Sequence, residues 1–315
     1  MAAFLTALML QDRFVTWGSG PQATEKIALR VRTILPVTAD RIDEGVILIS
    51  GGKIEAVGRV EIPDDYRRIE LDGVAAPGFV DLHVHIAGGD INDAAVKSNP
   101  ELRTLDVIVP ENPDLKRTLA GGVSTALFLP GSATSVGGLG TLIKTHGATA
   151  EEMLIRFPGA LKIAQGNNPL GVPYVGNTHM GNNWIIRDAL REGKAYHERW
   201  ERYERGESAA PERIERLDAL RGLFAREFPA AVHTQYFHVS QATYRILVDE
   251  LGIWTVFDHS TFDAFKNWEA VKARDIPTIC GPRMLWLDIE TSQIHGIAPG
   301  PSTRLPAPFS TATPP

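Results

Sequence analysis

The sequence predicts an α/β protein in which a parallel β/α region follows a small N-terminal β region. Strand-like and helix-like patterns alternate from residue 78 to residue 283, which is typical of parallel β/α architectures. Residues 26–73 instead read as consecutive short strands, with a Gly-Gly hairpin signal at 51–52. A chain of 315 residues can bury one barrel-sized core together with such an appendage.

The composition is that of an ordinary globular protein, and it excludes several classes of function. Hydrophobic residues make up 43% and charged residues 22% of the chain, and the net charge is −6. This balance gives no electrostatic footprint for nucleic acid, and no stretch reaches the length of a membrane span. The single Cys280 excludes an intrachain disulfide framework. Residues 1–10 lack the features of a signal peptide, so we expect a cytoplasmic protein.

The segment Phe79–Ile86 carries the clearest chemical signal. It follows the turn signal Pro77-Gly78 and alternates apolar with polar residues, as a strand does. Asp81, His83 and His85 should therefore point to one side. Two imidazoles spaced i, i+2 at a strand end can bind one metal ion, with zinc–nitrogen distances of about 2.0–2.1 Å. The alternative is a core strand whose histidines are satisfied by hydrogen bonds.

Residues 76–85, Ala-Pro-Gly-Phe-Val-Asp-Leu-His-Val-His, resemble the first barrel strand of the amidohydrolase superfamily, and in particular its imidazolonepropionase-related branch. The resemblance extends over roughly residues 25–296. It implies a (β/α)₈ TIM-type barrel at 74–296, with a small N-terminal β-sandwich portion at 26–73. The tail at 297–315 is rich in Pro, Ser and Thr and should be disordered.

The resemblance also assigns metal ligands to successive strand ends. The pair on strand 1 is His83 and His85, strand 4 supplies Lys162, strand 5 supplies His233 and strand 6 supplies His259. A lysine in a buried strand is costly unless it is neutralised or paired. In this superfamily that lysine reacts with carbon dioxide and bridges two metals as a carbamate; the alternative is a strand-end lysine that reaches water. The nitrogen and oxygen donors suit one or two Zn²⁺ or similar divalent ions.

The loops at the expected barrel mouth suggest substrate contacts. After strand 2 we expect a glycine-rich loop at 131–140 and a third strand at Thr141–Lys144. A long loop at 171–183 would bring His179 to the substrate, and a surface histidine is the alternative. Arg283, at the end of the expected strand 7, would bind a substrate carboxylate or lie on the surface.

The catalytic base is the missing part of the pattern. The superfamily places an aspartate on strand 8, and no such strand follows residue 296, so we expect a barrel that is incomplete at its C-terminus, with Asp288 as a candidate substitute base. We predict a hydrolase that cleaves a cyclic amide, amide or peptide-like C–N bond through a metal-activated water. The alternative is a truncated or degenerate homologue that binds metal without catalysis. We expect a small-molecule substrate, no nucleic acid or membrane partner, and allow for a homo-oligomer that would complete the barrel.

Overall fold

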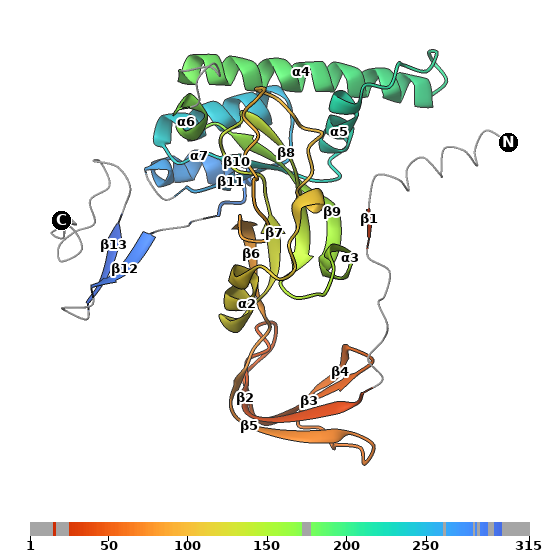
Figure 1. Ribbon diagram of the computed structural model, residues 1–315, viewed down its shortest axis with the longest axis vertical. Coiled ribbons are helices and arrows are strands. Elements are labelled where there is room, and N and C mark those ends of the chain that lie inside the picture. The colour runs from red at the N-terminus through yellow and green to blue at the C-terminus, as the bar shows by residue number, and fades with distance from the viewer. Residues whose placement is uncertain are drawn as a thin grey trace.

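The computed structural model describes residues 15–16, 25–171, 178–260, 263–279, 281, 284–288 and 293–297. The described part is a mixed α/β fold, as the sequence predicts (Figure 1). A small N-terminal sheet lies at one end of the molecule, and a larger curled sheet separates it from a group of helices at the other end (Figure 1). Among the helices of these residues, none is long and apolar enough to cross a membrane.

The N-terminal sheet has four strands in the order β4-β3-β2-β5. They are β2 (Ile27–Ile34), β3 (Ile42–Ser50), β4 (Lys53–Gly58) and β5 (Arg67–Ala75). Gly51 and Gly52 join β3 to β4 with φ angles of 56° and 73°, which glycine adopts without a steric penalty. One face holds a small core of Ala28, Val46, Leu48, Ile62 and Tyr66. The expected strands are present, and in the described residues they form one sheet rather than both layers of a sandwich.

The larger sheet runs in the order β11-β10-β9-β8-β7-β6, with the two-residue β1 (Val15–Thr16) added beside β9. Its strands are β6 (Phe79–Val84), β7 (Val123–Phe128), β8 (Val136–Lys144), β9 (Leu154–Ala164), β10 (Ala230–His233) and β11 (Thr255–Asp258). The pairs β6–β7, β9–β10 and β10–β11 are parallel. Parallel strands bring their carboxyl ends to one edge of the sheet, and the candidate site lies there.

Strand β8 departs from the sequence prediction, because it is antiparallel to both β7 and β9. The expected strand at Thr141–Lys144 is present as the last part of β8, but its expected parallel direction is wrong, and the expected loop at 131–140 is too long because the strand already begins at Val136. Parallel neighbours need a crossover of about a dozen residues or more, and the connection from Phe128 is much shorter. The glycines in this strand allow close packing, since a Cβ on Gly138 would lie 2.6 Å from the Leu102 carbonyl oxygen.

The helices cover the larger sheet and continue the alternation. They are η1 (Thr104–Val107), α2 (Pro113–Ala120), α3 (Ala150–Met153), η2 (Asn168–Gly171), α4 (His179–Glu204), α5 (Glu215–Phe224), α6 (Phe237–Thr243), the π-helix η3 (Tyr244–Glu250), η4 (Ala264–Asn267) and α7 (Trp268–Ala273). The main hydrophobic core packs α4, α5, α6 and η3 against the outer faces of β9 and β10. Helix α4 begins at His179 because the Thr178 hydroxyl accepts from the Gly181 amide. The expected loop at 171–183 is therefore shorter than predicted.

The last part of the described chain only partly matches the expected strand 7 at 276–283. A single parallel bridge joins Phe257 to Thr278, and the amide of Ile279 donates to the Phe257 carbonyl at 2.7 Å. Beyond it, β12 (Met284–Asp288) and β13 (Gln293–Ile297) form an antiparallel hairpin. The predicted disordered tail at 297–315 lies outside the described residues except for its first position.

Candidate metal centre

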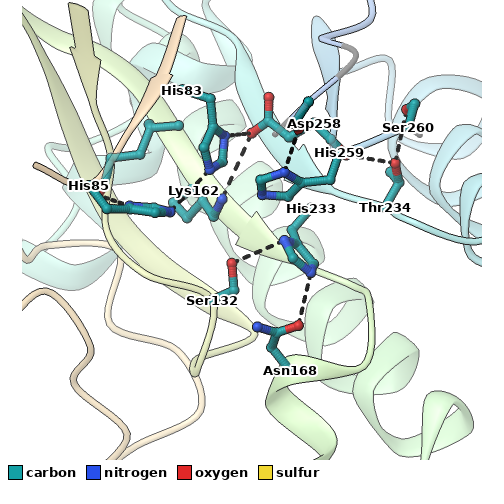
Figure 2. Close-up of polar contacts among 12 residues, drawn as sticks. His83, His85, Ser132, Lys162, Asn168, His233, Thr234, Asp258, His259 and Ser260 are labelled. Atoms are coloured by element: carbon teal, nitrogen blue, oxygen red, sulfur yellow. Dashed lines mark hydrogen bonds and ion pairs between the residues drawn. The ribbon is translucent and has the colours of Figure 1, made fainter. Parts of the chain in front are cut away.

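Strand periodicity and register bring polar side chains from three neighbouring strands to the inner face of the curled sheet. Leu161 and Ile163 of β9 pack outward into the main core, so the buried Lys162 between them faces inward. In the parallel register Ala231 pairs with Lys162, and His233 pairs with Asp258. The side chains of Lys162, His233 and Asp258 therefore meet at one end of the sheet (Figure 2).

Four imidazoles converge there from strands far apart in the sequence (Figure 2). The ring centroids of His83 and His85 are 4.8 Å apart, and those of His83 and His259 are 4.2 Å apart. The ring of His233 lies 4.5 Å from that of His259. The structure thus brings together the five residues that the sequence predicts as ligands, including Lys162. Their role as ligands remains a prediction.

Two of these rings are held by a hydrogen bond at Nδ1, and a third faces a carboxylate there, so Nε2 of all three is directed into the site. The Nδ1–H of His85 donates to the Leu129 carbonyl at 3.0 Å, and that of His259 donates to the Gly281 carbonyl at 2.7 Å. The Nδ1 of His83 faces Asp258 Oδ2 at 2.8 Å, although the angles there are not those of a hydrogen bond. Because a carbonyl oxygen can only accept, the proton of His85 and of His259 is on Nδ1 and the lone pair is on Nε2.

The spacing of two nitrogens fits a shared cation. His83 Nε2 and His85 Nε2 lie 3.0 Å apart. At that distance a proton on His83 Nε2 can be donated to His85 Nε2, and an ion that replaces this proton can bind both nitrogens. Two nitrogens bound to one zinc ion at about 2.0–2.1 Å would lie about 2.8–3.4 Å apart. Among the described residues, no group of three or more His, Cys, Asp or Glu side chains is spaced to hold a metal ion as it stands. The fit therefore rests on the donor chemistry and on this pair.

Burial keeps the imidazoles neutral, which is the form that binds metals. It is the main cause that lowers the pKa of His83 to about 2 and that of His259 to about 4. It also lowers the pKa of His85 and holds that of His233 well below its ordinary value, with the positive Lys162 adding to both effects. Each ring therefore has one nitrogen lone pair at neutral pH.

Lys162 and Asp258 form a buried charged pair at the centre of the site. Their side chains are fully buried, and Nζ lies 3.8 Å from Oδ2, which is beyond hydrogen-bonding distance. Burial lowers the pKa of Lys162 to about 8 and raises the pKa of Asp258. Lys162 Nζ and both Asp258 oxygens have no hydrogen-bond partner among the described residues. Such atoms are costly to bury, and a ligand that binds between them would satisfy them.

Sequence reasoning did not single out Asp258, Ser132 or Asn168 as site residues. Asp258 directly precedes His259, and simple strand alternation would send these two side chains to opposite faces. His259 has a φ of 59°, however, and this left-handed turn of the backbone ends the alternation so that both face the site. The sequence feature that could have identified Asp258 is an Asp-His pair at the end of a buried strand. The Ser132 hydroxyl and the Asn168 amide approach the His233 ring from loops, where periodicity gives no prediction.

The other predicted site residues lie elsewhere. His179, the first residue of α4, packs its ring against that of His238 of α6, with the centroids 4.8 Å apart, and no hydrogen bond or ring contact among the described residues joins it to the four imidazoles. Asp288 lies in β12, where its backbone pairs with Gln293. Figure 1 shows this hairpin away from the larger sheet. Arg283 lies outside the described residues. The role of these three residues thus gains no support from their position.

Comparisons with known proteins address the family to which the chain belongs. No model of a known protein family matches the chain. A curated relative, the amidohydrolase tasK of Hapsidospora irregularis, is 28% identical over 156 residues; the match covers 42% of this chain and 16% of that protein, about a sixth of its length. A solved structure, an amidohydrolase from Thermotoga maritima MSB8, is 30% identical with a TM-score of 0.77, over 84% of this chain and 72% of that one. On this similarity in sequence and fold, the chain belongs to the amidohydrolase superfamily.

Proposed function

We propose that this chain is a metal-dependent hydrolase that cleaves a carbon–nitrogen bond in a small amide, cyclic amide or peptide-like substrate. The observation that carries the proposal is the convergence of four neutral imidazoles with Lys162 and Asp258 in one buried cluster. A divalent ion of the zinc type, when bound, supplies Lewis acidity that polarises a carbonyl oxygen and makes water nucleophilic near neutral pH. The assignment to the imidazolonepropionase-related branch remains part of this proposal.

Each residue of the cluster has a part that follows from its contacts. His83, His85 and His259 would bind the ion through Nε2, because their Nδ1 atoms face acceptors. Asp258 lies 2.8 Å from the His83 Nδ1 and would keep negative charge behind this ring, as carboxylate partners of metal-bound histidines do. The Asp81 carboxylate accepts from the His83 amide at 3.0 Å and fixes the backbone at the strand end.

Lys162 is the residue that we propose to carry a carbamate. The ammonium would first lose one proton. The neutral amine would then add to the carbon of carbon dioxide, forming an N–C bond as one C–O double bond becomes single, and would release a second proton, so a cation becomes an anion with two oxygen donors. The fully buried Nζ without a hydrogen-bond partner supports this proposal, as does the facing cluster of nitrogen donors. A second divalent ion would then find ligands on both sides of the modified lysine. ¹³C NMR of protein in ¹³C-bicarbonate would detect a carbamate signal that disappears in Lys162→Met.

The test of the function combines bound metal with hydrolysis. The purified full chain is stripped with a chelator, reloaded with Zn²⁺, Mn²⁺ or Co²⁺, and analysed for metal content and for hydrolysis of acyl amino acids, dipeptides and cyclic imides. We expect His83→Ala/His85→Ala to lose the bound ion and the activity. The exposed His146, in the β8–α3 connection, gives the matched control His146→Ala, which should keep both.

Two results would overturn the proposal in different ways. A double variant that retains the full metal content would place the ion elsewhere. A chain that binds metal through these histidines but hydrolyses none of the panel would instead favour the alternative of a homologue that binds metal without catalysis.

A further inference from the structure

A cavity separate from the metal centre lies between α4 and the segment formed by α6 and η3, at the helical end of the molecule (Figure 1). Its volume of about 320 Å³ is within the range of small-molecule sites in proteins. These helices pack against the outer faces of β9 and β10, whereas the imidazoles lie on the inner face of the sheet. The described residues that line the cavity are Met180, Asn183, Arg187, Ala242, Arg245 and Ile246.

The lining combines an apolar floor with positive charge. Ala242 and Ile246 are buried, and the exposed Met180 adds a flexible apolar side chain. Both charged residues among the described lining residues are arginines. The Nε of Arg245 donates to the Gln241 carbonyl at 3.1 Å, and no carboxylate of the described residues pairs with this guanidinium. The cavity therefore favours a ligand that carries negative charge and an apolar part.

The polar side chains of the cavity are held in place and still have hydrogens to donate. Arg187 donates through Nε to Glu250 at 3.0 Å, and Arg245 is also held through its Nε. The Asn183 Oδ1 accepts from Gln165 Nε2 at 2.7 Å, which leaves the Asn183 Nδ2 as a donor. A guanidinium has five N–H groups, so each arginine keeps its Nη hydrogens for a ligand. Side chains that are already ordered lose less conformational entropy when a ligand binds.

The π-helix η3 explains why two arginines from different helices reach one cavity. Arg245 and Glu250 are five residues apart in η3. On an α-helix such residues lie on different faces, whereas the i→i+5 pattern of a π-helix brings them towards one face. Because Glu250 holds Arg187, this guanidinium of α4 comes to the side of Arg245. Glu250 also accepts from Arg191, so three arginines share one carboxylate and an excess of positive charge remains.

We propose that this cavity is a binding site for a small carboxylate with an apolar body. The planar forks of the two arginines match the two oxygens of a carboxylate, and the Asn183 amide adds a donor. The floor of Ala242 and Ile246 takes the apolar body, which a simple inorganic anion lacks. The inference goes beyond the proposed function and does not depend on it, because the cavity contains no residue of the metal centre.

The first experiment locates the ligand by NMR. The full-length chain is labelled with ¹³C-methyl methionine, and the Met180 signal is assigned by its loss in Met180→Leu. Titration of the metal-free chain with phenylacetate should shift this signal with a dissociation constant in the millimolar range. The signal of Met153, which is fully buried in another core cluster, should not move. The neutral phenylacetamide has the same shape and should bind at least about tenfold more weakly.

The second experiment measures the affinity for phenylacetate by isothermal titration calorimetry. Removal of one guanidinium should weaken binding about tenfold, because it removes hydrogen bonds to a charged group. We expect this effect in Arg245→Met and no detectable binding in Arg187→Met/Arg245→Met. Arg117→Met, on the exposed face of α2, is the matched control and should bind like the natural chain. Thermal unfolding shows whether each variant is folded, and Arg245→Met keeps the test decisive if the double variant does not fold.

Three results would overturn the inference. The first is a Met180 signal that stays unchanged at phenylacetate concentrations well above the millimolar range, and the second is an Arg245→Met chain that binds like the natural one. The third is an equal shift with inorganic phosphate, which would show that the apolar floor has no part in binding. A chain that binds no metal would refute the proposed function and leave these measurements intact.

Discussion

Replacing Lys162 by methionine tests whether the buried charged pair contributes to stability. The two side chains are fully buried with Nζ 3.8 Å from Asp258 Oδ2, and methionine fills nearly the same volume as lysine. The change therefore removes a charge with little loss of packing. Asp258 is left as a buried carboxylate without its cation, which is one of the few single changes expected to have a large effect.

The magnitude has a ceiling that follows from the chemistry of the carboxyl group. Removing one partner of a buried ion pair typically costs about 3–5 kcal/mol. Asp258 can instead take up a proton, and from its ordinary pKa of 3.8 this costs about 1.4 kcal/mol for each pH unit, or about 4 kcal/mol at pH 7. The variant also no longer has to bury an ammonium group, whose pKa burial already lowers. We therefore expect the free energy of unfolding to fall by about 2–4 kcal/mol.

The assay is urea unfolding of the metal-free chain in the presence of a chelator, followed by circular dichroism. The double variant Lys162→Met/Asp258→Asn should recover most of the loss, because it leaves no buried charge. Lys116→Met, on the exposed face of α2, is the matched control and should change stability by less than about 0.5 kcal/mol. The reasoning would be refuted by a Lys162→Met chain as stable as the control, or by a double variant less stable than the single one.

Three further changes test other parts of the structure. Gly166→Ala would place a Cβ 2.6 Å from His233 Cδ2, so we expect a loss of about 1–3 kcal/mol in stability together with weaker zinc binding, measured by unfolding and chelator competition. Asn182→Leu removes buried hydrogen bonds to Ser135, in the loop before β8, and to Ala164, at the end of β9, and should cost about 2–4 kcal/mol in urea unfolding; a loss below about 1 kcal/mol would contradict this. Arg221→Leu breaks the ion pair of the buried Arg221 with Glu204 of α4 and should lower the melting temperature clearly more than Arg216→Leu, which breaks the pair of the more exposed Arg216 with Glu192; equal shifts would show that burial of the arginine is irrelevant here.

The sequence predicted the elements that carry the imidazoles because their signals are local. Apolar runs that end in a histidine identify β10 and β11, and the polar alternation of Phe79–Ile86 identifies β6. Lys162 stood out because a charge inside an apolar run needs a partner, and the structure provides one in Asp258. These predictions depend on patterns that repeat every few residues, and such patterns can be read from the sequence without knowing the fold.

The direction of β8 could not be predicted in the same way. Its residues have the composition of a glycine-rich loop followed by a short strand, and the β/α alternation favoured a parallel neighbour. Strand direction depends on the strands beside which the segment lies, here Thr125–Phe128 on one side and Leu154–Ile163 on the other. The glycines of β8 leave room for both neighbouring strands, but the local sequence pattern does not indicate which strands these are. The short connection between β7 and β8 could have indicated the antiparallel direction, because it is too short for the crossover that parallel neighbours need.

The contents of the site depend on how its strands end. A strand places alternate side chains inside, so β11 alone could offer Asp258 or the following residue to the site, not both. The left-handed backbone of His259 removes that limit, and the carboxylate then reaches both Lys162 and His83. The end of β9 acts similarly, because Gly166 and Asn168 leave the strand and approach His233 from a direction that no strand residue could take. Periodicity therefore finds the ligands, whereas the residues that orient them lie where periodicity stops.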